Sequence, residues 1–395
     1  MENNVKIILK KGKEQSVKRL HPWIFSGAIR KTIGNPAEGD IVEVLSDHEE
    51  FLALGHYQIG SISVRIFSFH SIEPDFQFWY NNIENAYRLR LQLGLAGNPN
   101  TNVYRLVNAE GDGMPGLVID YYNGIAVLQM HSVGMYKIRY QLTDILKKLY
   151  GQKLTAVYDK SESTIPYKAG LEAKNEFLWG DQNLATVTEN NCNFFVDVRE
   201  GQKTGFFIDQ RDNRNLLSTY CMHKKVLNVF CYTGGFSVYA VKNDASLVHS
   251  VESSSAAIGM TDKNIRLNGF SAGIHHSFCT DAFAFLRENK TQYDIIILDP
   301  PAFAKHQNAL ANALQAYKRI NQLAIEQLKP GGILFTFSCS QVVSRENFRK
   351  SVFAAAANTR RNVGILHQLT QPPDHPVSIY HPEGEYLKGL VLYVS

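Results

Sequence analysis

Apolar residues occur in short runs through the first part of the chain, with Gly, Pro and Asp between them. The segments VKIIL, DIVEVLS, FLALGHY and ISVRIFSF, all within residues 5–69, have the length and composition of β-strands. Turn residues separate each of these segments from the next. This pattern predicts a small β domain over residues 1–73.

Near Pro74 the spacing of apolar residues changes. Positions 79, 83, 86, 89 and 93 are apolar and recur every three to four residues, which predicts an amphipathic helix. The segments YRLVNAEG, GLVIDYY, IAVLQMH and LTAVYDK then indicate strands, and a second helix is predicted near residues 135–149. We therefore expect an α+β middle domain over residues 74–190.

Strand and helix patterns alternate over residues 191–395. KVLNVF, SLVHSVE, GIHHSFC, YDIIILD and GGILFTFS have the apolar runs of buried strands, and ALANALQAYKRINQLAIEQL lies between two of them with a helical period. Such alternation predicts a parallel, doubly wound sheet, so the expected fold class is α/β. YLKGLVLYV, at residues 386–394, is expected to add an edge strand.

The composition is that of an ordinary globular protein, with 44% hydrophobic and 20% charged residues. A chain of 395 residues exceeds what one core usually organises, in agreement with several domains. No secretory signal and no membrane-spanning run is present, so a cytoplasmic protein is expected. The five cysteines include no CxxC pair, and we expect neither a metal site nor a disulfide framework.

The net charge is only +4, but basic residues are concentrated near the N-terminus. Such an excess is able to follow an RNA backbone, although a solvated charged face is the other explanation. The predicted RNA contacts are Lys10, Lys11, Lys13, Lys18, Arg19 and Arg30.

The first strand of the doubly wound region runs into a glycine turn, where ligands of such folds bind. The predicted cofactor contacts in this turn are Phe230, Tyr232, Thr233, Gly234, Gly235 and Phe236. Glu252 ends the second strand, where a carboxylate is able to accept hydrogen bonds from ribose hydroxyls. The turn lacks the GxGxxG pattern that seats a pyrophosphate, which favours S-adenosylmethionine (SAM) over a dinucleotide. Asp281 follows the third strand as either an adenine contact or a helix N-cap.

The fourth strand ends in the polar sequence DPPAFAK. A carboxylate at the end of an apolar strand is costly unless it meets a ligand, so Asp299 is a candidate catalytic residue. Cys339 ends the fifth strand, close to Asp299 in such a sheet, and a thiolate there is able to add to carbon 6 of a pyrimidine and activate carbon 5. The predicted base-binding loop comprises Pro300, Pro301, Phe303 and Lys305.

These segments resemble the RlmI-type family of large-subunit ribosomal RNA cytosine-5 methyltransferases over nearly the whole chain. The motifs that carry the resemblance are HPWIFSGAI, RLVNAEGDGMPGLVIDYY, DVREGQKTGFFIDQRDNR, NVFCYTGGFS, DPPAFAK, FSCS and HPEGEYLKG. The resemblance implies an N-terminal PUA-like RNA-binding β barrel and a C-terminal Rossmann-like class I SAM methyltransferase domain. It also implies ribosomal RNA as the partner, 5-methylcytidine as the product, and Gln210 and Arg211 as SAM contacts.

Several alternatives stay open at this stage. Arg211 and Asp212 are also able simply to begin and cap a helix. A guanine methyltransferase of the same fold needs no cysteine nucleophile, and an RNA-binding assembly factor needs no turnover. Lys305 and His306 are the nearby candidates for the base that removes the carbon 5 proton. The sequence leaves a homodimer possible.

Overall fold

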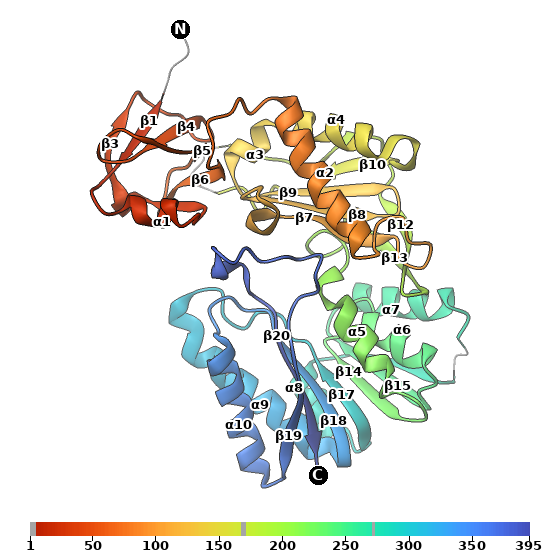
Figure 1. Cartoon of the computed structure of the whole chain (residues 1–395). Helices are drawn as coiled ribbons and strands as arrows, with labels where there is room; N and C mark the ends of the chain where they lie inside the picture. Colours follow the sequence, from red (N-terminus) through yellow and green to blue (C-terminus); the bar gives the residue numbers. More distant parts are fainter. Residues whose placement is uncertain (1–4, 167–170, 271–272) are drawn as a thin grey trace. The chain divides into compact units, whose positions relative to one another are not determined.

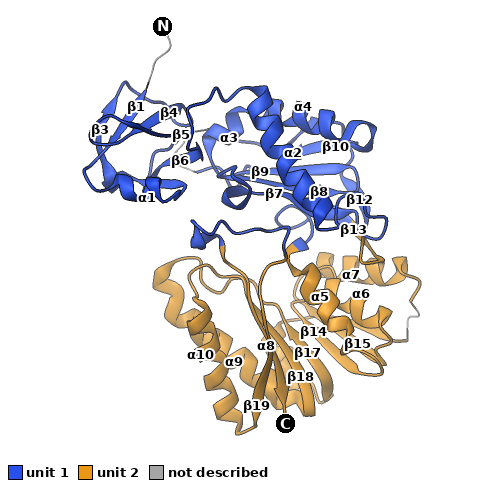
Figure 2. Cartoon of the chain, viewed as in Figure 1, with its two compact units in different colours: residues 1–187, 196–208, 373–384 blue, residues 188–195, 209–372, 385–395 orange. Residues whose placement is uncertain are grey.

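The computed structural model describes residues 5–166, 171–270 and 273–395, which form two compact units (Figure 2). Unit 1 consists of Met1–Val187, Val196–Ile208 and Pro373–Gly384; unit 2 consists of Thr188–Phe195, Asp209–Pro372 and Glu385–Ser395. Residues 196–208 and 373–384, which the sequence placed in the C-terminal domain, thus cluster with unit 1. The division into three domains stays a prediction. In the described part of the chain, no helix has the length and apolarity needed to cross a membrane.

Unit 1 begins with a six-stranded sheet in the order β2-β6-β5-β4-β1-β3 (Figure 1). Alternate residues of its strands enclose a small apolar core that includes Ile7, Val44 and Val64. β1, β4, β5 and β6 are the four strands that the sequence predicted, whereas α1, β2 and β3 were not predicted. The elements are β1 (Lys6–Leu9), α1 (Glu14–Lys18), β2 (Trp23–Phe25), η1 (Ser26–Ala28), β3 (Ile29–Ile33), β4 (Ile41–Leu45), β5 (Phe51–Tyr57) and β6 (Ile62–Ser68).

The second sheet of unit 1 has the order β11-β10-β9-β8-β7. The predicted amphipathic helix is α2, which starts where the Asp75 carboxylate accepts from the Phe78 N–H at 2.8 Å and buries Trp79 and Ile83. The helix predicted near residues 135–149 is in fact two helices, because the backbone leaves helical geometry at Ile138. The elements are α2 (Phe76–Gln92), β7 (Val103–Asn108), η2 (Ala109–Asp112), β8 (Leu117–Tyr122), β9 (Ile125–Met130), α3 (Val133–Lys137), α4 (Arg139–Tyr150), η3 (Gly151–Lys153), β10 (Ala156–Asp159) and β11 (Glu176–Trp179).

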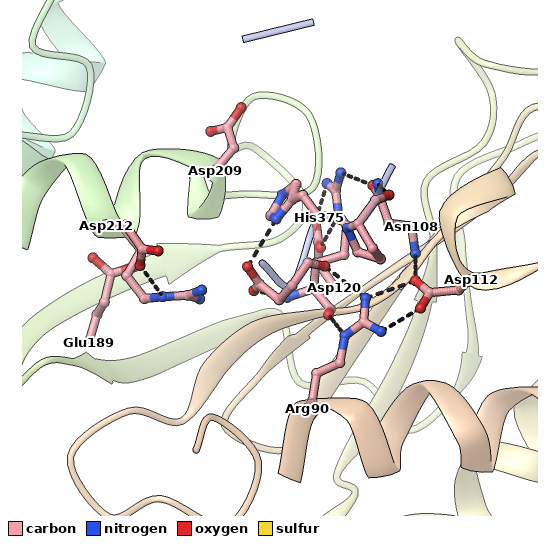
Figure 3. Close-up of polar contacts among 12 residues, drawn as sticks. Arg90, Asn108, Asp112, Asp120, Glu189, Asp209, Asp212 and His375 are labelled. Atoms are coloured by element: carbon pink, nitrogen blue, oxygen red, sulfur yellow. Dashed lines mark hydrogen bonds and ion pairs between the residues drawn. The ribbon is translucent and has the colours of Figure 1, made fainter. Parts of the chain in front are cut away.

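Residues 373–384 return to unit 1 and are fixed there by buried polar contacts. Arg90, fully buried, holds the Asp112 carboxylate with two hydrogen bonds of 2.6 and 2.8 Å and donates to the Asp374 carbonyl at 2.7 Å (Figure 3). The Asp374 carboxylate accepts from the Arg105 N–H at 3.0 Å. A Cβ on Gly111 would lie 1.8 Å from the Pro376 carbonyl oxygen, so only glycine permits this approach.

Unit 2 contains a seven-stranded sheet in the order β16-β15-β14-β17-β18-β20-β19. β14 to β18 are parallel, as the alternating pattern predicted, and helices α8, α9 and α10 bury one face of the sheet.

The elements of the rest of the chain, from β12 onward, are β12 (Leu184–Glu189), β13 (Cys192–Asp197), η5 (Ile208–Gln210), α5 (Arg211–Ser218), β14 (Lys225–Val229), α6 (Gly235–Lys242), β15 (Leu247–Glu252), α7 (Ser255–Leu267), β16 (His275–Cys279), α8 (Ala282–Glu288), β17 (Tyr293–Leu298), η6 (Gln307–Ala309), α9 (Leu310–Gln327), β18 (Leu328–Ser338), α10 (Arg345–Thr359), β19 (Val363–Leu369), η7 (Pro382–Gly384) and β20 (Lys388–Val394).

The prediction that residues 386–394 form an edge strand is wrong. β20 lies between β18 and β19 and is antiparallel to both, so β19 is the edge strand. The burial of the two strands gives the reason. All but one residue of β20 are buried, as an interior position requires, whereas β19 is partly exposed along its length.

Candidate active site

Five predicted site segments follow the five parallel strands of unit 2, and all five leave the sheet at its carboxyl edge. In the spatial order of the strands they are Asp281 after β16, Glu252 at the end of β15, residues 230–236 after β14, Asp299 after β17 and Cys339 after β18. The chain reverses its direction of progress across the sheet between β14 and β17, which is where doubly wound folds bind their ligands. The structure therefore brings these predicted residues into one row.

The loop after β14 has an unusual backbone. Phe230 and Tyr232 have φ angles of 60° and 49°, a left-handed conformation that side chains disfavour. Gly234 has φ 81° and precedes the first residue of α6. The hydroxyl oxygen of Thr233 is buried and has no hydrogen-bond partner. A strained loop with an unsatisfied buried donor at a strand end is a site shaped for a polar ligand.

We predict that Gly234→Ala lowers both stability and cofactor affinity. A Cβ at this position would lie 2.7 Å from Cγ2 of Thr261, and the positive φ adds strain, so we expect a loss of about 1–3 kcal/mol in the free energy of unfolding. Urea unfolding and calorimetric titration with SAM measure the two effects. Gly259→Ala, inside α7 with open space around it, is the control and is expected to be neutral or stabilising. Equal behaviour of the two variants would contradict the prediction.

Glu252 and Asp281 occupy neighbouring strand ends. The Glu252 carboxylate accepts from the N–H groups of Ser253 at 2.8 Å and Tyr232 at 3.3 Å, which fixes its orientation beside the β14 loop. The Asp281 side chain accepts from the Ala284 N–H at 2.9 Å and caps α8. Asp281 is exposed, so the cap leaves one carboxylate edge accessible to a ligand.

Asp299 is half-buried at the end of β17, next to the start of α5. Burial, together with the charge of Asp209, raises the pKa of Asp299 to about 7. The Gln210 side chain hydrogen-bonds the Asp299 carboxyl group and also accepts from Asn213 at 2.6 Å. Asp209 accepts from the Tyr386 hydroxyl at 2.8 Å, and its other carboxylate oxygen is buried without a hydrogen-bond partner. Asp299 is therefore present partly as the acid near neutral pH.

We predict that Asp299 makes the protein less stable as the pH rises. The pKa of Asp299 is higher in the folded state than in the unfolded state, so the unfolded chain loses the proton first. The stability therefore falls from about pH 4, where the unfolded carboxyl group ionises, to about pH 7, where the folded one does, and changes no further above that. Relative to Asp299→Asn, the wild type should lose about 2 kcal/mol of unfolding free energy between about pH 5 and about pH 8. Urea unfolding of both proteins at the two pH values measures the difference.

Asp294→Asn, at the other end of β17, provides the control for this measurement. Although burial opposes it, hydrogen bonds from the Lys225 N–H and from Lys329 lower the pKa of Asp294. A lowered pKa keeps Asp294 ionised throughout this range, so Asp294→Asn should follow the wild type between about pH 5 and about pH 8. A wild type and an Asp299→Asn variant with parallel pH profiles would disprove a buried, titrating Asp299.

Cys339 lies directly after β18, half-buried, with its Sγ atom 3.9 Å from the carbonyl oxygen of Pro300. The Ser340 hydroxyl donates to the Ala304 carbonyl at 2.6 Å, so the loops after β17 and β18 are joined. The Phe303 ring packs on Tyr317, at 4.7 Å between centroids, and on Phe230 at 6.5 Å. Pro301 and Lys305 are exposed, and Pro300 is buried.

The remaining predicted residues differ in burial and in the unit to which they belong. Phe236 is buried against Phe337, and Arg211 is buried at the first turn of α5 with its guanidinium 3.4 Å from Asp212. All six predicted RNA contacts are exposed, but they belong to unit 1, outside the row of strand ends in unit 2.

Sequence reasoning missed four side chains of unit 2. Asp209 acts on Asp299 and accepts from Tyr386, and Lys388 is paired with Ser338, the residue before Cys339. Arg214 lies behind the glycine turn, with its Cδ 3.2 Å from where a Gly235 Cβ would be. Asp209 and Arg214 flank the predicted Gln210 and Arg211 in the segment FIDQRDNR. The dense group of charged residues in this short segment was the feature of the sequence that could have indicated Asp209 and Arg214.

Comparison with known proteins identifies the family. The profile of the S-adenosylmethionine-dependent methyltransferase family matches residues 116–384, and that of the PUA-like domain matches residues 7–69. The chain belongs to the SAM-dependent methyltransferase family. This methyltransferase is 40% identical to Ribosomal RNA large subunit methyltransferase I of Aeromonas salmonicida, over 98% of this chain and 99% of the relative. It is 38% identical to the protein of the same name in Erwinia tasmaniensis, over 99% of both chains.

Two solved structures share the fold of this methyltransferase. A SAM-dependent methyltransferase from Streptococcus mutans has a TM-score of 0.84 at 22% identity and covers 98% of this chain and 100% of its own. The crystal structure of the methyltransferase SMU.776 complexed with SAH has a TM-score of 0.85, with the same identity and coverage. The predicted fold class, a PUA-like N-terminal domain with a Rossmann-like methyltransferase domain, is confirmed, and so is SAM as cofactor.

The residues of the carboxyl edge fit SAM. The unsatisfied Thr233 hydroxyl and the strained β14 loop suit the polar methionine end, and Glu252 on the next strand is oriented to accept from ribose hydroxyls. Asp281 follows β16, the strand beside β15, and its exposed carboxylate is able to accept from an adenine amino group. These groups lie on consecutive strand ends of one sheet edge.

Proposed function

We propose that the protein methylates carbon 5 of a cytosine in large-subunit ribosomal RNA, in the cytoplasm, with Cys339 as the nucleophile. The observation that carries the proposal is the placement of Cys339 and Asp299 at adjacent strand ends, joined through the loop of Pro300, beside the residues that fit SAM. The names of the relatives at 38–40% identity over nearly the full length support ribosomal RNA as the substrate.

In the proposed mechanism the Cys339 thiolate adds to carbon 6 of the cytosine. The carbon–sulfur bond forms while the electron pair of the C5–C6 double bond moves through C4 toward N3. Asp299, with a pKa of about 7, donates its proton to N3 and so stabilises the adduct. SAM, when bound, would supply an electrophilic methyl group for carbon 5, with S-adenosylhomocysteine as the leaving group. A base then removes the carbon 5 proton, the C6–S bond breaks and releases Cys339 as a thiolate, and N3 returns its proton to Asp299.

The decisive experiment identifies the methylated nucleoside. Purified protein is incubated with SAM carrying a tritiated methyl group and with ribosomal RNA from cells that lack the activity. The RNA is then digested, and the labelled nucleoside is identified by chromatography and mass. We expect the label in 5-methylcytidine. Label in a guanosine derivative would overturn the cytosine mechanism, and unlabelled RNA with intact SAM binding would overturn the proposed substrate.

We also propose that the basic N-terminal residues contact the RNA backbone. Lys10 and Lys13 are exposed, and each phosphate contact that is lost should lower the slope of log affinity against log salt by about 0.7–0.9. Filter binding of ribosomal RNA by the Lys10→Ala/Lys13→Ala protein at several salt concentrations measures this slope. Lys6→Ala is the control, because Lys6 is already paired with Glu43 at 3.5 Å. An unchanged slope in the double variant would place the RNA elsewhere.

A further inference from the structure

A buried lysine lies beside Cys339 and has no role in the mechanism above. Lys388 is the first residue of β20 and is paired with Ser338, the residue before Cys339, in the antiparallel ladder with β18. Its side chain is almost completely buried. The sequence gives no chemical reason for a lysine here, because the rest of β20 is an apolar strand. A buried ammonium group requires compensation by an anion or by hydrogen bonds.

The ammonium group of Lys388 holds the loop that follows Cys339. Its Nζ donates to the Ser340 carbonyl at 2.5 Å and to the Val343 carbonyl at 2.9 Å. Ser340 in turn donates to Ala304 in the loop after Asp299. Lys388 therefore fixes the junction of the two loops that carry the proposed catalytic residues. Two of its three N–H groups are used, which leaves one for a further acceptor.

Cys339 lies between the two residues that Lys388 engages, because Ser338 is its ladder partner and the Ser340 carbonyl accepts from Nζ. Within the described residues, no carboxylate lies at ion-pair distance from Nζ; Glu385 acts on it only from further away, and Arg345 on α10 repels it. Burial lowers the pKa of Lys388 to about 8, and a charged Cys339 opposes this shift more than any other group. Tyr317 on α9 and Asp299 face the same region, and neither supplies positive charge. Among these groups, a Cys339 thiolate is the anion that most favours the charged form of Lys388.

We propose that Lys388 is a positioning residue that holds Cys339 as a thiolate and fixes the loop after it for attack on the base. The inference rests on the proposed covalent role of Cys339. A thiol is a poor nucleophile and a thiolate a good one, and a neighbouring ammonium group favours the thiolate. The interaction is reciprocal: the thiolate keeps Lys388 charged, and Lys388 keeps Cys339 deprotonated.

The test measures the ionisation of Cys339 without RNA or SAM. The rate of Cys339 alkylation by iodoacetamide is followed against pH by mass spectrometry of its peptide, in a Cys279→Ser background because Cys279 is the exposed cysteine. In Lys388→Met the alkylation midpoint should rise by about one pH unit or more, and Lys388→Arg should restore most of the shift. Lys329→Met, which removes a lysine from the opposite end of β18, should leave the midpoint unchanged. An unchanged midpoint in Lys388→Met would overturn the proposal.

A reciprocal measurement covers the case in which Lys388→Met does not fold. In Cys339→Ser, a nearly isosteric change, the pH midpoint for reductive methylation of Lys388 should fall relative to the wild type, because the stabilising thiolate is gone. An equal midpoint in both proteins would overturn the pairing. Neither readout depends on the methylated base. If ribosomal RNA is labelled in guanosine while the midpoints shift as expected, the proposed function fails and the pairing stands. If the RNA is labelled in 5-methylcytidine while the midpoints do not shift, the pairing alone is rejected.

Discussion

Cys339→Ala should abolish the formation of 5-methylcytidine, with a loss of at least about 10⁴-fold in turnover, while SAM binds as in the wild type. The reason is that cytosine carbon 5 has no nucleophilic character until a thiolate adds to carbon 6, so the variant lacks the step that creates the attacking atom. Cys339 lies after β18 and outside the strand ends that fit SAM, so its removal should leave the cofactor site intact. Single-turnover transfer of tritiated methyl groups measures the rate, and calorimetry measures SAM affinity.

Cys279→Ala is the matched control for this experiment. Cys279 also ends a parallel strand of the same sheet, β16, but it is exposed and precedes Asp281 rather than the proposed base site. Its removal should leave turnover unchanged. Methylation that survives in Cys339→Ala would exclude the covalent mechanism and favour transfer to a nitrogen atom, which needs no thiolate.

Glu189→Gln should destabilise unit 2 by about 3–5 kcal/mol, the largest stability effect that we expect. Arg214 donates to the two Glu189 carboxylate oxygens at 2.8 Å each, and both side chains are buried. The Tyr239 hydroxyl donates to the same carboxylate at 3.0 Å. Loss of the carboxylate charge leaves the Arg214 guanidinium buried without its counterion, which is the costly way to break such a pair. Urea unfolding followed by circular dichroism measures the change.

Glu189→Gln should also weaken SAM binding, because Arg214, which would lose its counterion, packs against Gly235 at the start of α6. Glu346→Gln is the control: Glu346 pairs with Lys350 on the surface of α10, and solvent screens this pair. If Glu189→Gln unfolded at the same urea concentration as Glu346→Gln, the Glu189–Arg214 pair would not be a principal support of the unit.

The positions of the predicted site residues at the strand ends of unit 2 could be predicted, because the local sequence determines where a strand ends. An apolar run followed by a polar or glycine residue marks the end of a buried strand, and parallel strands bring such ends to one edge, so Glu252, Asp299 and Cys339 were found from their positions alone. The structure adds the spatial order of these strand ends along the sheet. Their chemical roles stay predictions.

Contacts between distant residues could not be predicted in the same way. An apolar run such as that of β20 indicates a strand but does not say which strands flank it, and hence its interior position was missed. Arg90 and Asp374 are 284 residues apart, and nothing in either segment indicates the other. Lys388 and Arg214 gain their importance only from partners that the fold brings near them.

The order in which the segments are synthesised limits how the two units can fold. Unit 1 is incomplete until residue 384 has been made, because Arg90 and Arg105 need Asp374 as a partner. In the described sheet of unit 2, the one strand paired with β19 is β20, which is made after it. β19 therefore has no strand partner while residues 373–384 of unit 1 are made. Neither unit is thus able to mature as an independent N-terminal domain during translation. The loop after Cys339, held by Lys388, should form as one of the last folding events.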